Sequence, residues 1–379
     1  MKTGTRFRKF FSPILVSLLI LNSSPSLAVE FGQDATGDPN AISTRYSSGF
    51  LYSERIVLTA AHIIVGGGET TLEEMKKQIA YWEQDQFVYA PGIGDRMNQK
   101  IYKIKKVLIA STYRSRVGID QTRIDDFAIL ILQESIPMKN KVVIASTDDI
   151  ASFIKDKTPV YMVGYGLQDP SQRTPPLYGT LSPRKMTSFL VSNEELRNYY
   201  KNNSNKVQQN QTMLDYGIPN SAKFGSVCDG DSGAGFFVEK GETRYYVGPV
   251  GGQQAGIPNC TSGATFGSEG GMSGITASNK FLPLIKEAEL IVAEDKEKES
   301  KKSEEVKIAA ELQAQQESDA KAKHEASVKA KAEEDARLEA EAKAKAEAAK
   351  KKTITCIKGK LSKKVTGMNP KCPKGYKRF

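Results

Sequence analysis

An abrupt change of composition near residue 289 divides the chain into parts that cannot share one core. From residue 289 to 352 nearly every position is Ala, Lys, Glu, Gln, Asp or Ser, and neither glycine nor proline occurs. Ala, Lys and Glu favour helices, and pairs of opposite charge recur four residues apart, as at Glu297 and Lys301. This segment predicts a solvated helical stalk, which would extend about 95 Å at 1.5 Å per residue.

Two other interpretations of the segment 289–352 stay open. Its larger apolar residues are too sparse for a sustained heptad repeat, so a coiled-coil dimer is the minority interpretation. A disordered charged linker would serve the same purpose with less reach. In every case the segment acts as a spacer and lies outside the folded body.

The amino terminus has the three-part pattern of a secretory signal peptide. Basic residues precede an apolar run at 10–21, and small and polar residues follow it up to Ala28. The apolar run is shorter than the ~20 residues that span a bilayer, which argues against the alternative of a membrane anchor. We therefore expect residues 1–28 to be removed and the protein to be secreted, either free or associated with the cell envelope, with no transmembrane segment left.

The cysteines agree with export. There are four, an even number, and thiols oxidise outside the cytoplasm. Cys228 and Cys260 lie in one region and Cys356 and Cys372 in another, so we expect a disulfide within each region. A zinc site is a poor alternative, because neither pair has the Cys-x-x-Cys spacing.

Residues 29–288 show an all-β pattern. Short apolar runs alternate with clusters of Gly, Pro, Asn, Asp and Ser, which predicts strands at 56–58, 106–109, 127–132, 159–163 and 244–247. Such folds accommodate this length as one or two barrel-like units. At the end of the region, Phe281, Leu282 and Ile285 have helical spacing behind the capping residue Ser278.

The last segment, 353–379, carries most of the net charge of +10. It has no acidic residue, and its basic residues are Lys358, Lys360, Lys363, Lys364, Lys371, Lys374, Lys377 and Arg378. Since the basicity belongs to this tail, we do not expect the whole protein to bind nucleic acid. A loop closed by Cys356 and Cys372 would present the lysines to an anionic cell-envelope polymer. The alternative is a tail that only improves solubility.

The stretch CDGDSGAG, at residues 228–235, raises a chemical question. Its glycines and Ser232 could simply form a tight turn, or the serine hydroxyl could be reactive. A serine nucleophile needs a base, usually histidine. The chain has two histidines, and His324 lies in the charged segment, so His62 is the one candidate.

Three motifs give the chain its family resemblance. The sequence VLTAAH ends at His62, DFAIL begins at Asp126, and GDSG contains Ser232. In this order they resemble the His, Asp and Ser motifs of the trypsin-like (chymotrypsin-fold) serine proteases. The resemblance covers about residues 29–287 and implies two packed six-stranded β-barrels with a C-terminal helix. The charged stalk and the small basic tail would follow.

The resemblance also implies catalytic roles. Ser232 attacks the scissile carbonyl, His62 takes up the proton, and Asp126 orients and stabilises the imidazole. Asp125 competes for the last role, but Asp126 has the spacing that the motif requires. The backbone N–H groups of Gly230 and Ser232 would form the oxyanion hole.

Further roles follow from the same family pattern. Asp231 would pair with the new α-amino group of Val29, which signal-peptide removal exposes; hydrogen bonding of Asp231 to local backbone is the alternative. Ser226 would lie at the floor of the specificity pocket, and its neutral side chain favours a small or apolar residue before the cleaved bond.

The pocket wall is matched only in part. Gly251 and Gly252 would belong to the strand that binds the substrate backbone, although the serine and tryptophan usual there are absent. The resemblance also assigns Cys228 and Cys260 to the disulfide that braces the pocket.

The sequence therefore predicts a secreted serine endopeptidase that acts on a protein or peptide substrate, with no cofactor and no metal. A catalytically inactive protein that keeps the protease fold for binding or adhesion is the main alternative. An esterase that uses the same three residues is a third possibility.

Overall fold

The structure is a computed structural model of the chain. It describes residues 32–44, 47–66, 71–94, 99–117, 122–166, 182–202, 215–219, 225, 227–228, 230–251 and 272–379. The predicted signal peptide, residues 1–28, lies outside these ranges. The chain divides into two compact units, the first ending at Glu294 and the second running from Asp295 to Phe379.

The first six-stranded sheet of the first unit is nearly closed. Its strand order is β2 (Ala41–Ser43), β3 (Ser48–Ser53), β4 (Ile56–Thr59), β9 (Ala128–Leu132), β6 (Ile101–Ile109) and β5 (Phe87–Tyr89). All neighbours are antiparallel, and an isolated bridge between Thr44 and Val88 joins the two edges. Every residue of β4 and β9 is buried, which agrees with their continuous apolar sequences.

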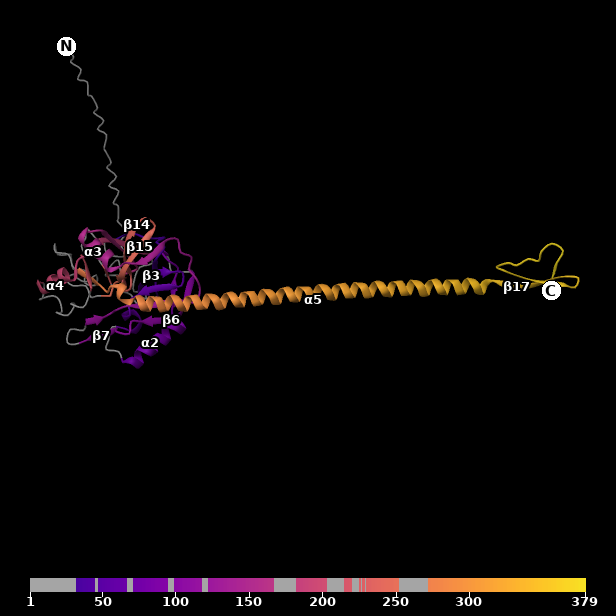
Figure 1. The fold of residues 1–379 in the computed structure, drawn as a ribbon, viewed down its shortest axis with the longest axis horizontal. Helices are drawn as coiled ribbons and strands as arrows, with labels where there is room; N and C mark the ends of the chain where they lie inside the picture. The colour runs from indigo at the N-terminus through magenta and orange to yellow at the C-terminus, as the bar shows by residue number, and fades with distance from the viewer. Residues whose placement is uncertain are drawn as a thin grey trace, which may run out of the picture. The chain divides into compact units, whose positions relative to one another are not determined.

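Except for β1, the strands of the second six-stranded sheet follow the first sheet along the chain. Its order is β1 (Gln33–Asp34), β12 (Arg184–Phe189), β11 (Pro159–Gly164), β14 (Gly235–Lys240), β15 (Thr243–Pro249) and β10 (Lys141–Ile144). Figure 1 shows β14 and β15 side by side, in agreement with their antiparallel pairing.

Two small ladders complete the strands of the first unit. Strand β13 (Tyr216–Pro219) pairs with β16 (Met272–Ile275), and β7 (Arg114–Val117) pairs with β8 (Thr122–Ile124). Single bridges, Val191 to Gly217 and Val250 to Ile275, connect the β13–β16 ladder to the segments that follow β12 and β15.

The β-rich prediction is confirmed for the first unit. The five predicted strand segments coincide, to within a residue or two at most ends, with β4, β6, β9, β11 and β15, although β6 begins five residues earlier. One sheet is nearly closed into a barrel, whereas the predicted closure of two full barrels stays a prediction.

Each sheet has its own apolar core, and aromatic rings connect the two. Leu58 and Leu130 are fully buried in the first core, and Phe236 and Met162 in the second. Phe50 on β3 lies 5.5 Å from the Phe237 ring and 4.7 Å from the Tyr246 ring, measured between centroids, and both partners belong to the second sheet. Burying each such ring contributes about 1.5–3 kcal/mol. The two sheets are therefore packed against each other, which brings loops at their ends together.

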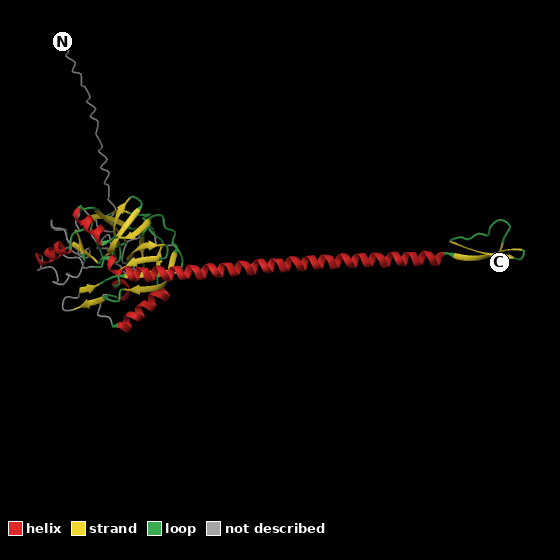
Figure 2. Ribbon diagram, viewed as in Figure 1, coloured by secondary structure: helices red, strands yellow, loops and turns green. Residues whose placement is uncertain are grey.

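Three helices that the sequence analysis did not predict lie at the periphery of the first unit (Figure 2). They are α2 (Leu72–Asp85), α3 (Thr147–Lys155) and α4 (Asn193–Asn202). Helix α2 begins with a capping box between Thr71 and Glu74, and α3 with one between Ser146 and Asp149. These start signals are readable in the sequence, but the surrounding strand pattern obscured them.

The helix predicted behind Ser278 is present. It starts as a 3₁₀ turn, η3 (Ser278–Phe281), and continues as α5 (Leu282–Lys350). Side chains at Glu297 and Lys301 form one of the expected ion pairs, at 2.7 Å. Within the part of the chain that the structure describes, no helix combines the length and apolar character needed to cross a bilayer.

The second unit ends in a three-stranded sheet. Strand β17 (Lys352–Lys358) lies between β18 (Leu361–Gly367) and β19 (Lys377–Arg378), and both pairings are antiparallel. The predicted disulfide between Cys356 and Cys372 is present, with Cys356 fully buried.

Candidate active site

Sheet register brings His62 next to Asp126. Strands β4 and β9 are antiparallel neighbours in which Thr59 lies opposite Ala128. His62 opens the short helix α1 (His62–Val65) just after β4, and Asp126 stands two residues before β9 begins. The two residues therefore reach the same end of the sheet.

Two hydrogen bonds join this pair. The backbone N–H of His62 donates to Asp126 Oδ1 at 2.8 Å, and His62 Nδ1 lies 2.7 Å from Asp126 Oδ2. The Asp126 side chain is 1% exposed and that of His62 is 11% exposed. A carboxylate in this position favours the imidazole tautomer with its proton on Nδ1, and in that tautomer Nε2 keeps its lone pair. This arrangement suits a general base.

Ser232 lies in a tightly bonded loop before β14. Asp231 N–H donates to the Cys228 carbonyl at 3.0 Å, and Ala234 N–H donates to the Asp231 carbonyl at 2.8 Å. Gly230 and Gly233 have φ angles of +93° and +80°, a region that favours glycine. A Cβ at Gly233 would also overlap Thr59 Oγ1. The turn thus requires glycines and leaves the serine, which is half-buried, at its tip.

The loop that carries Ser232, described at residues 230–234 and called the serine loop below, is anchored to the first sheet. Ser48 N–H, at the start of β3, donates to the Ser232 carbonyl at 3.0 Å. Gly233 packs against Thr59, three residues before His62. The elements that carry the three predicted catalytic residues therefore meet. Among the described residues, no hydrogen bond joins Ser232 Oγ to His62, and such bonds are often long before substrate binds.

The N–H groups of Gly230 and Ser232 are the predicted oxyanion donors. Within the described ranges, neither Gly230 N–H nor Ser232 N–H donates to a backbone carbonyl. The Gly230 and Ser232 carbonyls, by contrast, accept bonds from Ser47 and Ser48. The sequence analysis did not single out these two serines, because they form no recognisable motif.

Asp231 is buried and bonded to backbone. Its Oδ1 accepts from Gly166 N–H at 2.7 Å and its Oδ2 from Cys228 N–H at 2.8 Å. A Cβ at Gly164 or Gly166 would overlap its carboxylate. The predicted amino-group partner, Val29, lies outside the described residues, so that pairing stays a prediction.

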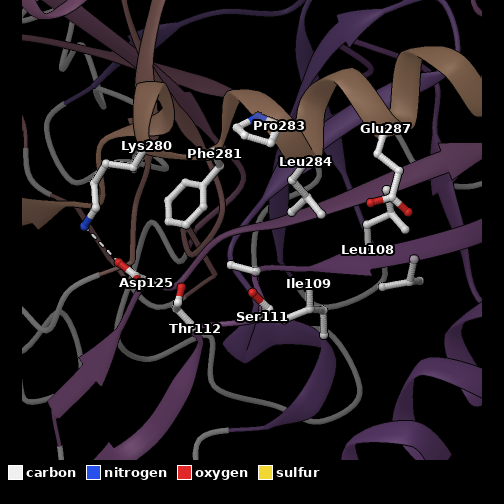
Figure 3. A pocket seen from close by; sticks show the side chains of 12 residues that line it. Leu108, Ile109, Ser111, Thr112, Asp125, Lys280, Phe281, Pro283, Leu284 and Glu287 are labelled. Atoms are coloured by element: carbon white, nitrogen blue, oxygen red, sulfur yellow. Dashed lines mark hydrogen bonds and ion pairs between the residues drawn. The ribbon is translucent and has the colours of Figure 1, made fainter.

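The neighbouring Asp125 points elsewhere. It has a φ of +50°, and its Oδ1 forms an ion pair with Lys280 Nζ at 2.8 Å (Figure 3). Burial opposes ionisation of Asp125, but hydrogen bonds from Lys280 and Thr112 and the Lys280 charge outweigh it and lower the pKa of Asp125. On the other side of Asp126, Phe127 stacks on Phe281 with ring centroids 4.7 Å apart.

A cavity of about 640 Å³ adjoins the Asp125–Lys280 pair. Figure 3 shows it between β6, the loop that follows β6, and the first turns of α5. Its lining combines apolar and polar side chains and includes none of the three predicted catalytic residues. No local pattern predicts this cavity, because its walls come from residues 107–125 and 280–287, which are more than 150 positions apart.

The remaining predicted residues are only partly described. Gly251 lies behind Asp126, where a Cβ would come 3.2 Å from Asp126 Cβ. Cys228 is disulfide-bonded, and its predicted partner Cys260 is outside the described ranges. The same holds for Ser226 and Gly252. In the ranges that the structure covers, no three His, Cys, Asp or Glu side chains gather as metal ligands would.

Comparison with known proteins identifies the family. The family model named Trypsin matches residues 32–269, which is more than half of the chain. The match includes both six-stranded sheets and all three predicted catalytic residues. The search of curated proteins gives no match. With its β-rich, chymotrypsin-like first unit and this match, the chain belongs to the trypsin family.

Proposed function

We propose that this protein is an active serine endopeptidase whose catalytic residues are His62, Asp126 and Ser232. The observation that carries the proposal is the doubly bonded pair of His62 and the buried Asp126, with bonds of 2.7 and 2.8 Å. Membership of the trypsin family supports a peptide substrate. Ser232 lies in the loop that is anchored beside this pair.

Each group has a defined task in the proposed reaction. Asp126 holds the proton on Nδ1, so His62 Nε2 can accept the Ser232 hydroxyl proton as Oγ attacks the peptide carbonyl. Protonated His62 then gives this proton to the leaving amine, and an acyl-enzyme ester on Ser232 is left. Water hydrolyses the ester by the same proton transfers in reverse roles.

The N–H groups of Gly230 and Ser232 stabilise the oxyanion of the tetrahedral intermediates. Positive φ at Gly230 and the absence of backbone acceptors for both donors, among the described residues, support this role. Loss of one such donor lowers kcat by about 10²–10³-fold.

A catalytically inactive binding protein of the same fold is less well supported. Such a protein has no need of a histidine held in the base tautomer by a carboxylate that is 1% exposed. A buried carboxylate costs free energy unless it is fully hydrogen-bonded, so its retention favours catalysis.

A fluorophosphonate probe tests the proposal without knowledge of the natural substrate. The full chain should be labelled, and Ser232→Ala should not be. His62→Ala should be labelled far more slowly, because the hydroxyl then lacks a base. A wild-type protein that folds but stays unlabelled would refute the proposed enzymatic activity. Labelling that persists in Ser232→Ala would refute it too.

If the probe labels the protein, cleavage of a peptide library by protein without the probe then distinguishes an endopeptidase from an esterase. Cleavage of internal peptide bonds is expected, with small or apolar residues before the cut. Hydrolysis of simple esters alone, with every peptide left intact, would contradict the endopeptidase assignment.

We further propose export and an anionic polymer as partner of the carboxy-terminal sheet. The Cys356–Cys372 disulfide joins β17 of this sheet to the segment that precedes β19, and the exposed residues of β18 include Lys363 and Lys364. With no acidic side chain in residues 353–379, attraction to a polyanion is unopposed locally.

Retention of the full chain on immobilised polyphosphate tests the polymer binding. We expect retention that weakens steeply with salt and is reduced in the double variant Lys363→Gln, Lys364→Gln. Equal retention of wild type and the double variant would contradict the proposal. Amino-terminal sequencing of the protein from culture medium tests export, which predicts a mature chain beginning at Val29.

A further inference from the structure

Ser48 makes contacts that no motif predicted and that converge on the serine loop. Its side chain is fully buried. The Ser48 hydroxyl donates to the Gly230 carbonyl at 2.8 Å and accepts from Tyr165 N–H at 2.9 Å. Its own backbone N–H donates to the Ser232 carbonyl at 3.0 Å. One residue of the first sheet thus bonds both residues whose N–H groups would form the oxyanion hole.

Ser47 adds a second bond to the same carbonyl. Its hydroxyl donates to the Ser232 carbonyl at 2.5 Å. The Ser48 carbonyl in turn accepts from Thr59 Oγ1 at 3.0 Å, which ties the two serines to the end of β4, close to His62. Three hydrogen bonds from Ser47 and Ser48 therefore connect the His62-bearing sheet to the serine loop.

Peptide planarity determines what these bonds control. A carbonyl held in place fixes the whole peptide plane to which it belongs. Ser48 holds the plane between Gly230 and Asp231, and Ser47 with Ser48 holds the plane between Ser232 and Gly233. The plane that carries Ser232 N–H lies between these two held planes. The plane that carries Gly230 N–H is separated from the first held plane only by the two rotations φ and ψ of Gly230.

Glycine at position 230 makes the bonds to its carbonyl important. Without a Cβ, Gly230 can rotate between many backbone conformations at little steric cost. Without the bond to its carbonyl, φ and ψ of Gly230 lose a restraint, and the Gly230 N–H is then no longer held toward the site where the oxyanion forms. Oxyanion donors act only when they are held at the right position before the reaction.

We propose that Ser48, assisted by Ser47, is a positioning residue that holds the oxyanion hole of this enzyme in its active conformation. The inference rests on the proposed peptidase function. It assigns to Ser47 and Ser48 no contact with the substrate, since each acts through the carbonyl that it holds.

The strand β2 provides a matched control for loss of a buried serine hydroxyl. Ser43 lies directly opposite Ser48 in the β2–β3 ladder and is equally buried. Its hydroxyl donates to the carbonyl of the adjacent Thr44 at 2.9 Å and, among the described residues, makes no bond to the serine loop. Ser43→Ala therefore removes the same group from the same ladder without touching the proposed function of Ser48.

The experiment measures the rate of Ser232 labelling by a fluorophosphonate, whose P=O oxygen occupies the oxyanion hole. In Ser48→Ala we expect the second-order rate constant to fall by about 10–100-fold, in line with the cost of small misplacements in active sites. Ser47→Ala should show a smaller decrease, since Ser48 N–H still bonds the Ser232 carbonyl. Ser43→Ala should label at the wild-type rate.

The pH profile separates positioning from damage to the base. The His62–Asp126 pair is untouched in these variants, so the midpoint of the rate–pH curve should stay at its wild-type value while the plateau falls. Urea unfolding of each variant shows that the measured protein is folded. If Ser48→Ala does not fold, Ser47→Ala decides the question by the same readouts.

The outcomes distinguish this inference from the proposed function. An unlabelled wild type refutes the peptidase itself. If the wild type is labelled and both Ser48→Ala and Ser47→Ala are labelled at the wild-type rate, only the positioning role is refuted. An equal decrease in Ser43→Ala and Ser48→Ala, or a shifted pH midpoint, also overturns it, because the hydroxyl would then act through general stability or through the base.

Discussion

The two six-stranded sheets position the proposed catalytic groups by different means. In the first sheet, His62 and Asp126 follow and precede strands that are direct neighbours, with Thr59 opposite Ala128. In the second sheet, Ser232 belongs to a loop whose position depends on contacts with the first sheet, through Ser47 and Ser48. Backbone register places the proposed base, whereas packing between the sheets places the proposed nucleophile.

This difference has consequences for tolerance to mutation. Register is supported by many ladder hydrogen bonds and by buried strands on both sides, so few single substitutions outside the pair should separate His62 from Asp126. The serine loop depends on a few residues with no substitute, namely glycines with positive φ and two buried hydroxyls. We therefore expect substitutions that add or remove a single heavy atom near Ser232 to lower the activity.

The largest effect should come from the pair within the first sheet. In Asp126→Asn the amide can donate to Nδ1 and so favours the wrong imidazole tautomer, and kcat/KM should fall by about 10⁴-fold. Steady-state kinetics on a cleaved library peptide measure this change. The adjacent Asp125→Asn is the matched control and should retain most activity, because Asp125 bonds Lys280 and not His62. Similar losses in both variants would contradict the assignment of Asp126.

The next effect tests the contact between the sheets. In Gly233→Ala the new Cβ would overlap Thr59 Oγ1 and the Ser48 carbonyl, and φ is +80°. We expect fluorophosphonate labelling to fall at least about 100-fold. The free energy of unfolding should fall by about 3 kcal/mol, because overpacking adds to the backbone strain.

Gly241→Ala is the control for backbone strain alone. Gly241 has a φ of +59°, but a Cβ there would meet no atom within 4 Å. Its cost should be about 1 kcal/mol with labelling unchanged. If Gly233→Ala behaves like Gly241→Ala in urea unfolding and labelling, the loop is not held by close contact between the sheets.

Sequence reasoning reached the first sheet better than the second. The motifs around His62 and Asp126 contain the strands that hold them, so these strands could be predicted from local pattern, and the family resemblance then implied that the two residues meet. The contacts of Ser47 and Ser48 with the serine loop join residues separated by 185 and 182 positions. Such contacts arise from packing between sheets, and no local pattern of apolar or turn residues encodes them.

Helices were missed for a different reason. The capping box at Thr71 and Glu74 could have been found, but the strand-like segments around it favoured an all-β interpretation. The long helix α5, by contrast, could be predicted because every local signal in its sequence agrees. Agreement among local signals, rather than the strength of one, separates the two cases.

The smallest expected effect concerns η3 (Ser278–Phe281), which contacts residues next to the first sheet. Lys280 in η3 pairs with Asp125, next to Asp126, and Phe281 stacks on Phe127. The two charged side chains are 41% and 15% exposed, so solvent screening limits the pair to about 0.2–1 kcal/mol. Lys280→Met should therefore lower stability slightly and change fluorophosphonate labelling less than tenfold. Lys286→Met, in α5 with a more exposed pair to Glu289, should leave both unchanged.

The sharpest test of the Asp125–Lys280 pair is how the stability difference between wild type and Lys280→Met depends on pH. The pKa of Asp125 is lowered from 3.8, because the bonds and charge of Lys280 outweigh burial, so its contribution is present above pH 3.8 and is lost as pH falls through the lower folded value. Burial opposes the charge of Lys280, but Asp125 and Asp215 outweigh it and raise the pKa of Lys280 above 10.5. The contribution of Lys280 to stability is therefore present below pH 10.5 and is lost as the pH rises through the higher folded value. The difference in unfolding free energy between wild type and Lys280→Met should thus be constant between these limits and shrink outside them. A difference that varies between pH 5 and 9 would show that another titrating group, not this pair, connects η3 to the first sheet.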